Sequence, residues 1–226
     1  MGRMGASDKP TADAAETDWA ATTETTLLDE ALALAPTRGW TWAMTYAAGA
    51  AAGFSKGEVE LLLPEGPRDL AALWSRRCDA AALAALADVD PGSLKVRERI
   101  HRAVTARVEA AMAHPEATRR WTGFLALPGH LPLGLRLLWE SADALWVWAG
   151  DTSTDENHYS KRAILAEVLG GVMLVRLAAG EEAAAQRLDR RIAQVMAFER
   201  WKASLKFAGL AQDAVTALGR MRYAWG

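Results

Sequence analysis

Apolar residues recur at three- and four-residue steps along most of the chain, which is the spacing of one face of an α-helix. We find no convincing run of alternating β-branched residues, the pattern of a half-buried strand. The pattern therefore predicts an all-α fold. Gly and Pro residues divide it into short helices over residues 25–35, 40–52 and 55–63, and longer helices over residues 67–87, 93–113, 115–126, 131–149, 155–179, 183–202 and 204–225.

The distribution of polarity divides the chain into four segments. Residues 1–22 are polar, lack the apolar core of a signal peptide and are expected to form a disordered tail. Residues 23–90 form a helix-turn-helix-like module, residues 91–203 a longer helical domain, and residues 204–226 a separate amphipathic segment. Because Glu167 and Arg176 interrupt the apolar stretch 163–179, no window is expected to span a membrane. The protein is expected to be soluble or to rest on a surface.

The first module resembles the DNA-binding head of TetR-type transcriptional regulators, through residues 27–32 and the glycine-flanked opening of its third helix, residues 53–57. A DNA-reading helix offers Arg, Lys, Asn or Gln to bases and phosphates. This helix carries Lys56 beside Glu58 and Glu60, and the chain has a formal net charge of −2. We therefore expect a TetR-like fold without a nucleic-acid partner. A ligand-responsive regulator of the TetR type remains the alternative function.

Residue chemistry offers no catalytic constellation. Cys78 is the single cysteine and lies in an Ala/Leu-rich helical pattern, which fits a reducing compartment. Glu98 and His101 have the Glu-x-x-His spacing of di-iron bundles, but that site needs the motif twice, and no second copy exists. A surface ion pair is the ordinary interpretation. We expect a binding protein rather than an enzyme, with no metal and no cofactor.

Two broad apolar stripes lie on the predicted helices 131–149 and 155–179. Core packing explains either stripe alone, whereas facing stripes rich in Trp, Met and Leu can also line a cavity for an apolar ligand. The candidate lipid-binding residues on these stripes are Leu135, Leu138, Trp139, Ala142, Leu145, Trp146, Leu165, Val168, Leu169, Val172 and Met173.

The C-terminal segment has the form of a helix that lies in a membrane interface. Its apolar residues follow helical steps, aromatic residues gather at its end, and Lys202, Lys206, Arg220 and Arg222 flank it. A terminal helix docked on the body or on another subunit is the alternative. The candidate membrane-facing residues are Phe207, Leu210, Leu218, Met221 and Trp225.

The connector from Gly150 to Arg162 carries the most specific pattern. Its run 153–156, Ser-Thr-Asp-Glu, is typical of a capping box that starts a helix. From that cap, helical spacing places His158, Lys161, Arg162 and Leu165 on one stripe, with Tyr159 beside them. The residues support two interpretations, a capped helix start and a recognition patch.

This connector is similar to a motif of the COQ-nine family of ubiquinone-biosynthesis accessory proteins, which occur in mitochondria and alphaproteobacteria. The family motif is met by Gly150, Asp151, Ser153, Thr154, Asp155, Asn157, Tyr159, Lys161 and Arg162, and shorter matches extend the resemblance over residues 25–202. Glu156 and His158 depart from it, because the family favours Phe and often Trp at these positions.

The resemblance implies a TetR-like all-α homodimer that has lost DNA binding. It implies that the protein binds isoprenoid quinone intermediates or phospholipid in an apolar cavity and presents them to the demethoxyubiquinone hydroxylase, a di-iron enzyme. The expected location is cytoplasmic, peripherally associated with the inner membrane. The implied partner-binding residues are Asp155, Asn157, His158, Tyr159, Lys161 and Arg162.

Overall fold

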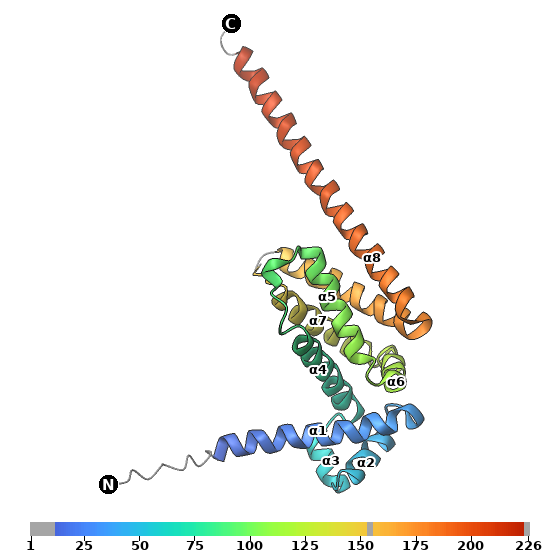
Figure 1. The fold of residues 1–226 in the computed structure, drawn as a ribbon. Helices are drawn as coiled ribbons and strands as arrows, with labels where there is room; N and C mark the ends of the chain where they lie inside the picture. The colour runs from blue at the N-terminus through green and yellow to red at the C-terminus, as the bar shows by residue number, and fades with distance from the viewer. Residues whose placement is uncertain (1–11, 153–155, 224–226) are drawn as a thin grey trace, which may run out of the picture.

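The computed structural model describes the backbone of residues 12–152 and 156–223, and the side chains of residues 22–152 and 158–197. Over these residues the chain is helical and contains no strand, which confirms the all-α prediction (Figure 1). The helices are α1 (Ala12–Arg38), α2 (Trp42–Ala51), α3 (Lys56–Leu62), α4 (Pro67–Ala85), α5 (Val96–Ala111), α6 (Pro115–Leu125), α7 (Leu131–Trp148) and α8 (Glu156–Tyr223), with a short 3₁₀ turn, η1 (Pro91–Ser93), before α5.

Helices α1, α2 and α3 form a head at one end of the molecule (Figure 1). The Thr41 hydroxyl accepts from the Met44 N–H at the start of α2, and Ser55 and Glu58 form a complete capping box at the start of α3. Gly49 allows α2 to approach α3, because a Cβ at that position would lie 2.1 Å from Val59 Cγ2. These local signals produce the helix-turn-helix-like module that the sequence predicts.

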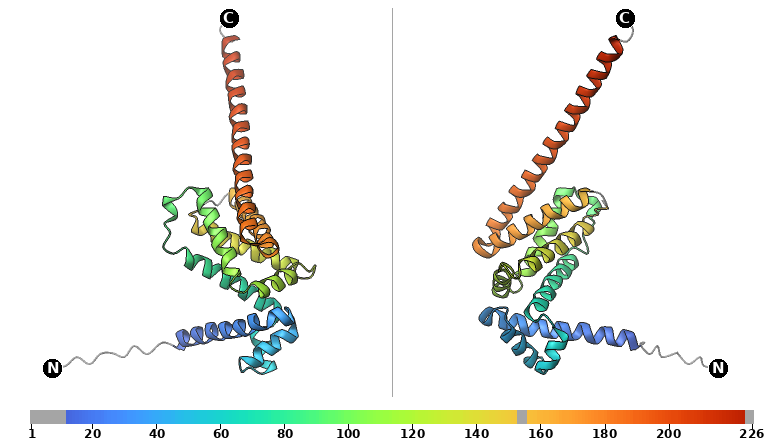
Figure 2. Two further views of the ribbon diagram at one scale, coloured as in Figure 1. Left: turned by 45° about the vertical axis from the view of Figure 1, so that its right-hand side comes forward. Right: turned by 180° about the vertical axis from the view of Figure 1, so that it is seen from behind.

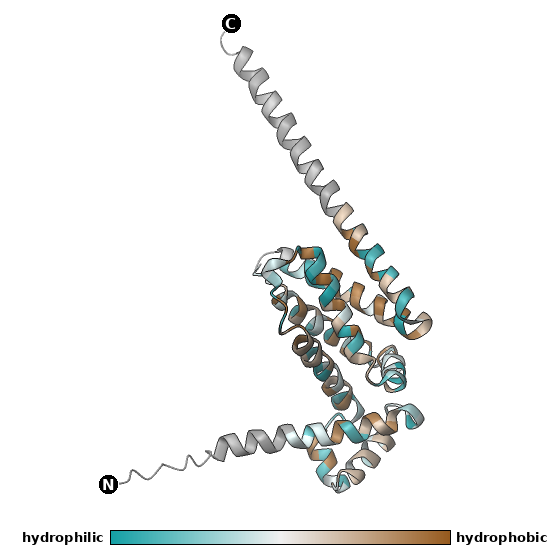
Figure 3. Cartoon of the chain, viewed as in Figure 1, coloured by the Kyte–Doolittle hydropathy of each residue, from teal (hydrophilic) through white to brown (hydrophobic). Residues whose placement is uncertain are grey.

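Helices α4 to α8 form the body, with α4 leading into it from the head (Figures 1 and 2). Gly66 has φ 56, and Pro67 then supplies the first residue of α4. Helix α4 packs on α5 and α7, and α8 packs on α5 and α7. Hydrophobic and hydrophilic residues alternate around the helices of the body, as expected where one face of each is buried (Figure 3).

One continuous apolar core joins the head to the body, from Leu27 in α1 to Leu188 in α8. Hydrogen bonds also cross between them, and the one from Trp40 is buried. The Trp40 indole donates to the Ala117 carbonyl of α6 at 3.2 Å, and the Arg77 guanidinium of α4 donates to Asp29 and to the Thr25 carbonyl of α1. The head is therefore packed as part of the molecule rather than tethered to it.

Helix α8 changes direction at Gly180, whose backbone has φ 88 and ψ −174. This break divides α8 into a first arm, residues 156–179, and a second arm, residues 181–223. Glu167 in the first arm accepts from Arg191 in the second at 2.5 Å, and Ala184 and Leu188 of the second arm are buried. The second arm then runs as one helix to Tyr223, without the boundary near residue 203 that the apolar pattern predicts. No Pro or Gly lies within residues 181–208, so nothing in the sequence ends the helix near residue 203.

Two expectations differ from the structure. Residues 12–22 are helical rather than disordered, because α1 begins at Ala12 in an Ala-rich stretch of high helix propensity. By length and composition alone, His158–Ala197 is apolar enough to cross a membrane, although no span was expected there. That stretch contains the break at Gly180 and places Leu165 and Val172 in the core, so its apolar character also serves internal packing.

Candidate functional site

Part of each predicted apolar stripe is buried in the interface between α7 and the first arm of α8. Several of the candidate lipid-binding side chains are buried there and contribute to the core. These core residues are Ala142, Leu145, Leu165, Val168, Leu169, Val172 and Met173. What remains available to a ligand lies in two apolar cavities at the edges of this interface.

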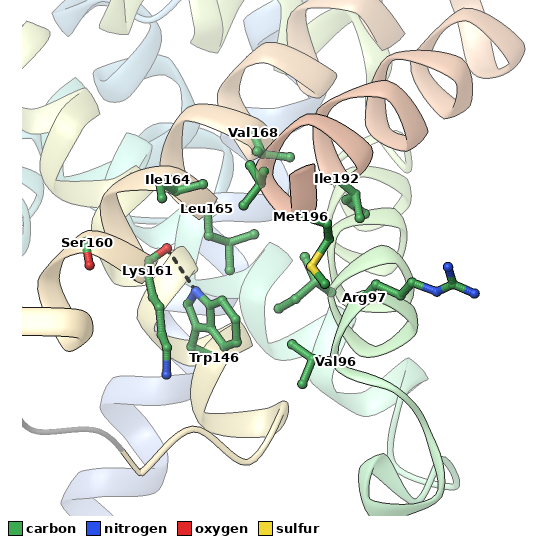
Figure 4. A pocket seen from close by; sticks show the side chains of 12 residues that line it. Val96, Arg97, Trp146, Ser160, Lys161, Ile164, Leu165, Val168, Ile192 and Met196 are labelled. Carbon is green, nitrogen blue, oxygen red and sulfur yellow. Dashed lines mark hydrogen bonds between the residues drawn. The ribbon is translucent and has the colours of Figure 1, made fainter. Parts of the chain in front are cut away.

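The first cavity, of about 220 Å³, lies between the start of α5, the end of α7 and both arms of α8 (Figure 4). Trp146 forms one wall and is held in place because its indole N–H donates to the Lys161 carbonyl at 3.0 Å. Val96, Ile192 and Met196 form the opposite side. Of the predicted lipid-binding residues, Trp146, Leu165 and Val168 line this cavity.

The second cavity, of about 240 Å³, lies between α6, α7 and α8. It gathers four predicted residues, Leu135, Leu138, Leu169 and Met173. The other lining residues, which the candidate set does not include, are Arg107, Trp121, Thr122, Leu125, Ala126, Leu131, Gly134, Gly170 and Leu174. Arg107 could have been noticed, because it occupies an apolar position in a helix otherwise patterned by Ile100, Val104 and Ala111.

Trp139 and Tyr159 form an aromatic surface outside both cavities. Their rings are stacked with centroids 6.2 Å apart, and the His158 ring meets Tyr159 edge-on at 5.1 Å. Tyr159 is 65% exposed. Trp139 therefore lies beside a residue of the predicted partner-binding set and lines neither cavity.

The basic residues of the connector are engaged in an ion-pair network that fixes the turn between α7 and α8. The Arg162 guanidinium donates to Asp143 at 2.5 Å and to Asp151 at 3.0 Å, and Lys161 Nζ donates to Asp151 at 2.6 Å. Burial lowers the pKa of Arg162, but the hydrogen bonds and charges of Asp143 and Asp151 outweigh it, and the pKa is raised. Arg162 thus remains charged and directed into the protein.

This geometry separates the partner-binding residues proposed from the sequence. Tyr159 and the half-buried His158 are available at the surface, whereas the Arg162 side chain is 3% exposed. Direct contact of Arg162 with a partner is therefore not supported. Of the expected stripe of His158, Lys161, Arg162 and Leu165, Arg162 and Leu165 face inward, because Arg162 is paired with carboxylates and Leu165 packs in the core.

Comparison with known proteins places the same region at the centre of a family match. A family model described as COQ9 matches residues 131–199, which contain α7, the connector and the beginning of the second arm of α8. The mitochondrial ubiquinone biosynthesis protein COQ9 of Bos taurus is 30% identical over 159 residues, which make up 67% of this chain and 49% of the relative. The Rattus norvegicus protein of the same name is 31% identical over 67% of this chain and 50% of its own. The chain belongs to the COQ9 family.

The chain spans about half the length of these COQ9 relatives. A shorter match, to the COQ9 protein of Xenopus tropicalis, is 37% identical over 75 residues and covers 33% of this chain. The family model begins at Leu131, the first residue of α7, and both cavities are partly lined by residues within it. The COQ9 match therefore coincides with the layer of helices that carries the cavities and the aromatic surface.

Some candidate residues lie outside the described part of the chain. These are Asp155 and Trp225, together with the side chains of Asn157, Phe207, Leu210, Leu218 and Met221. The capping box expected at residues 153–156 also includes positions outside it.

The remaining motifs have structural partners in this COQ9-family chain. Glu98 accepts from the Lys95 backbone N–H at the start of α5, and His101 Nε2 lies 3.4 Å from Asp189 Oδ1 on α8. Among the described residues, no group of three or more His, Cys, Asp or Glu could hold a metal ion.

Helix α3 of the head makes contacts that compete with DNA recognition. Lys56 lies 3.9 Å from Glu60 and 4.7 Å from the centre of the Tyr46 ring, and the Tyr46 hydroxyl donates to Glu60 at 2.8 Å. Its one described cation is thus paired with an acidic side chain of the same helix. A duplex would meet Glu58 and Glu60 at this surface, which disfavours phosphate binding.

Proposed function

We propose that this chain is a non-enzymatic lipid-binding accessory protein of ubiquinone biosynthesis. It holds apolar quinone intermediates, or phospholipid, in the cavities beside α7 and α8, and presents them to the demethoxyubiquinone hydroxylase at the inner membrane. The observation that carries the proposal is the coincidence of the COQ9 match over residues 131–199 with two apolar cavities. The pathway is inferred from the relatives, which are named as ubiquinone biosynthesis proteins.

The size and lining of the cavities suit part of a lipid rather than a whole one. An apolar cavity of about 150 Å³ is enough to hold a benzene-sized ring, and each of these cavities is larger. Leu131, Leu135 and Leu174 are exposed at the margin of the second cavity, where they can cover an apolar chain that continues outside it.

The exposed Tyr159 and the half-buried Trp139 are the proposed contact with the hydroxylase. Aromatic side chains that are partly exposed and rigidly stacked are common anchors of protein interfaces. The C-terminal segment, residues 204–226, is proposed to bring the protein to an anionic membrane surface, and the protein is proposed to act as a peripherally bound cytoplasmic homodimer.

Organic extraction of the purified native protein followed by mass spectrometry tests lipid binding. Ile164→Trp should fill the first cavity and Leu138→Trp the second, because each residue lines one of them. Val147→Trp is the matched control, since Val147 is exposed and lines neither. We expect an isoprenoid or phospholipid in the wild-type extract and its loss from at least one cavity variant whose helical circular dichroism is unchanged. An extract without lipid from the wild type contradicts the proposal.

Flotation with anionic vesicles tests the membrane part separately. Removing residues 204–226 should leave a folded protein that floats much less, because the amphipathic pattern of that segment is lost. Equal flotation of the shortened protein would assign the segment to packing alone.

A further inference from the structure

Arg107 is a buried cation in the wall of an otherwise apolar cavity. It extends from α5, lines the second cavity, and its side chain is 3% exposed. A buried charge of this kind is costly unless its hydrogen-bonding groups are satisfied. The contacts of its three nitrogen atoms therefore show which hydrogen-bond donors the protein leaves unsatisfied.

Two of the three nitrogens are engaged by the protein. Nε donates to Asp79 Oδ1 on α4 at 2.5 Å, and Nη2 lies 3.2 Å from the Ser75 hydroxyl and 3.5 Å from the Ser141 hydroxyl. Nη1 is buried and has no hydrogen-bond partner among the described residues. One edge of the guanidinium is thus held firmly by α4 and α7, while the remaining nitrogen has two N–H groups to donate.

The other polar side chains in the cavity wall already donate to the backbone. The Trp121 indole N–H donates to the Ala71 carbonyl at 3.0 Å, and the Thr122 hydroxyl donates to the Thr118 carbonyl at 2.9 Å. Both bonds lie within or between helices of the body. Among the residues of this wall, Arg107 Nη1 is consequently the buried side-chain polar atom that lacks a protein partner.

We propose that Arg107 Nη1 is the polar anchor of the second cavity and donates a hydrogen bond to an oxygen of a neutral, quinone-like head group. The proposal rests on the proposed lipid-binding function and specifies how one end of the lipid is held. A guanidinium only donates, so the ligand atom must be an acceptor. A carbonyl oxygen of an oxygenated ring meets this requirement.

Charge balance selects a neutral head over a carboxylate or phosphate. Asp79 already neutralises Arg107 at 2.5 Å, and both side chains are largely buried. An anionic head would add a second negative charge to a buried pair that is already balanced, which is unfavourable in a site of low polarity. A carbonyl satisfies Nη1 without changing the net charge.

The margin of the cavity sets the orientation of the ligand. Leu131, Leu135 and Leu174 line it and are all exposed, with Leu135 at 59%. An apolar tail attached to a head at Arg107 would cover these side chains and remove them from water. The head therefore lies inward and the isoprenoid tail runs outward across α7 and α8.

Isothermal titration calorimetry with three soluble probes of equal tail length tests this anchor. The probes are a short-chain ubiquinone analogue, an alkylbenzene without ring oxygens, and an alkyl carboxylate. For the wild-type protein we expect the quinone to bind at least about tenfold more tightly than either other probe, which is the effect of a hydrogen bond to a charged donor. Equal affinity for the quinone and the alkylbenzene would overturn the proposal.

The variants are chosen to preserve the fold. Arg107→Met combined with Asp79→Leu removes both charges together, because replacing a buried pair by apolar residues is often tolerated whereas removing one partner is not. The double variant should bind quinone only as tightly as alkylbenzene. Retention of the wild-type preference in this variant, with an unchanged circular dichroism spectrum, would overturn the proposal.

Gly170→Leu provides a second and independent variant. Gly170 lines the cavity, and a Cβ there would make ordinary contact with Leu138 at 3.4 Å, so the longer side chain should fill the space without disrupting α8. It should weaken binding of quinone and alkylbenzene alike. If it leaves quinone binding intact, the head is held elsewhere and the anchor is wrong, although the lipid-binding function stands. If the wild-type protein binds none of the probes and its native extract contains no lipid, both proposals fail.

Discussion

Arg162 and Asp151 form a buried ion pair that closes the connector between α7 and α8, with Arg162 Nη1 3.0 Å from Asp151 Oδ2. The side chain of Arg162 is 3% exposed and that of Asp151 is 5% exposed. The most specific motif in the sequence therefore has a structural role in at least two of its residues. Predictions about the motif must separate this role from partner binding.

Asp151→Ala should destabilise the protein by about 2–3 kcal/mol, because it removes the buried carboxylate partner of the Arg162 guanidinium and leaves it the partly exposed Asp143 and the His158 carbonyl. Urea unfolding followed by circular dichroism measures this change. Asp189→Ala is the control, since that carboxylate is exposed and should contribute within about 0.5 kcal/mol. Equal midpoints for the Asp151 variant and the wild type would show that the pair contributes no net stability.

Tyr159→Ala should abolish pull-down of the hydroxylase while changing the unfolding free energy by only about 0.5 kcal/mol, because the ring is exposed. Leu61→Ala, at an exposed position on α3, is the matched control and should leave the pull-down intact. Lys161→Glu is unsuitable for this purpose, since it would place a carboxylate beside Asp151 and disturb the connector itself. Wild-type capture by the Tyr159 variant would leave the motif with its structural role alone.

Cys78 should be unreactive in the folded protein. Its side chain is buried, and burial raises the pKa of the thiol to about 12. At about pH 8 only ~10⁻⁴ of it would be the reactive thiolate. We expect negligible reaction with an aromatic disulfide reagent in buffer and complete reaction in denaturant. Rapid modification under native conditions would mean that α4 opens locally.

Helix α3 should lose stability in acid. The Ser55 hydroxyl and the Ser55 backbone N–H both donate to Glu58 and hold its pKa below its ordinary value of 4.5. The carboxylate therefore stabilises the folded state fully above pH 4.5, and this contribution is lost as the pH falls through the lower folded pKa. Glu58→Gln should flatten the acid side of the unfolding profile measured between about pH 3 and pH 7. A profile identical to that of the wild type would exclude the cap as an acid-sensitive element.

Helix positions were largely predictable because Pro and Gly mark them locally. Pro115 opens α6 and Leu131 opens α7 at the expected residues, and Ser55 caps α3 as its sequence indicates. The continuity of α8 past residue 203 was not predictable in the same way, because no breaking residue or cap distinguishes the two predicted segments. Helical spacing also placed Leu165 and Arg162 on one face correctly.

The candidate cavities were only partly predictable because they depend on packing between distant helices. Spacing identified Leu138 and Trp146, but it could not separate them from core residues such as Leu145 and Val172. Arg107 was missed because its burial depends on an ion pair with Asp79, which lies 28 residues earlier and on another helix. An arginine on an apolar helix face, opposite an Asp on the neighbouring apolar face, is the signal that would have found it.

Trp121 forms part of the cavity wall and also donates to the Ala71 carbonyl of α4, the helix that begins at the edge of the head. A residue of the cavity wall is therefore hydrogen-bonded to one of the helices that hold the fold together. Binding of a ligand in this cavity would be linked thermodynamically to global unfolding. Its binding free energy would therefore raise the free energy of unfolding of the whole protein, and not only stabilise one helix. Ligand binding can thus be followed through the melting temperature of the protein, even for a ligand that has no absorbance of its own and does not alter the helix content.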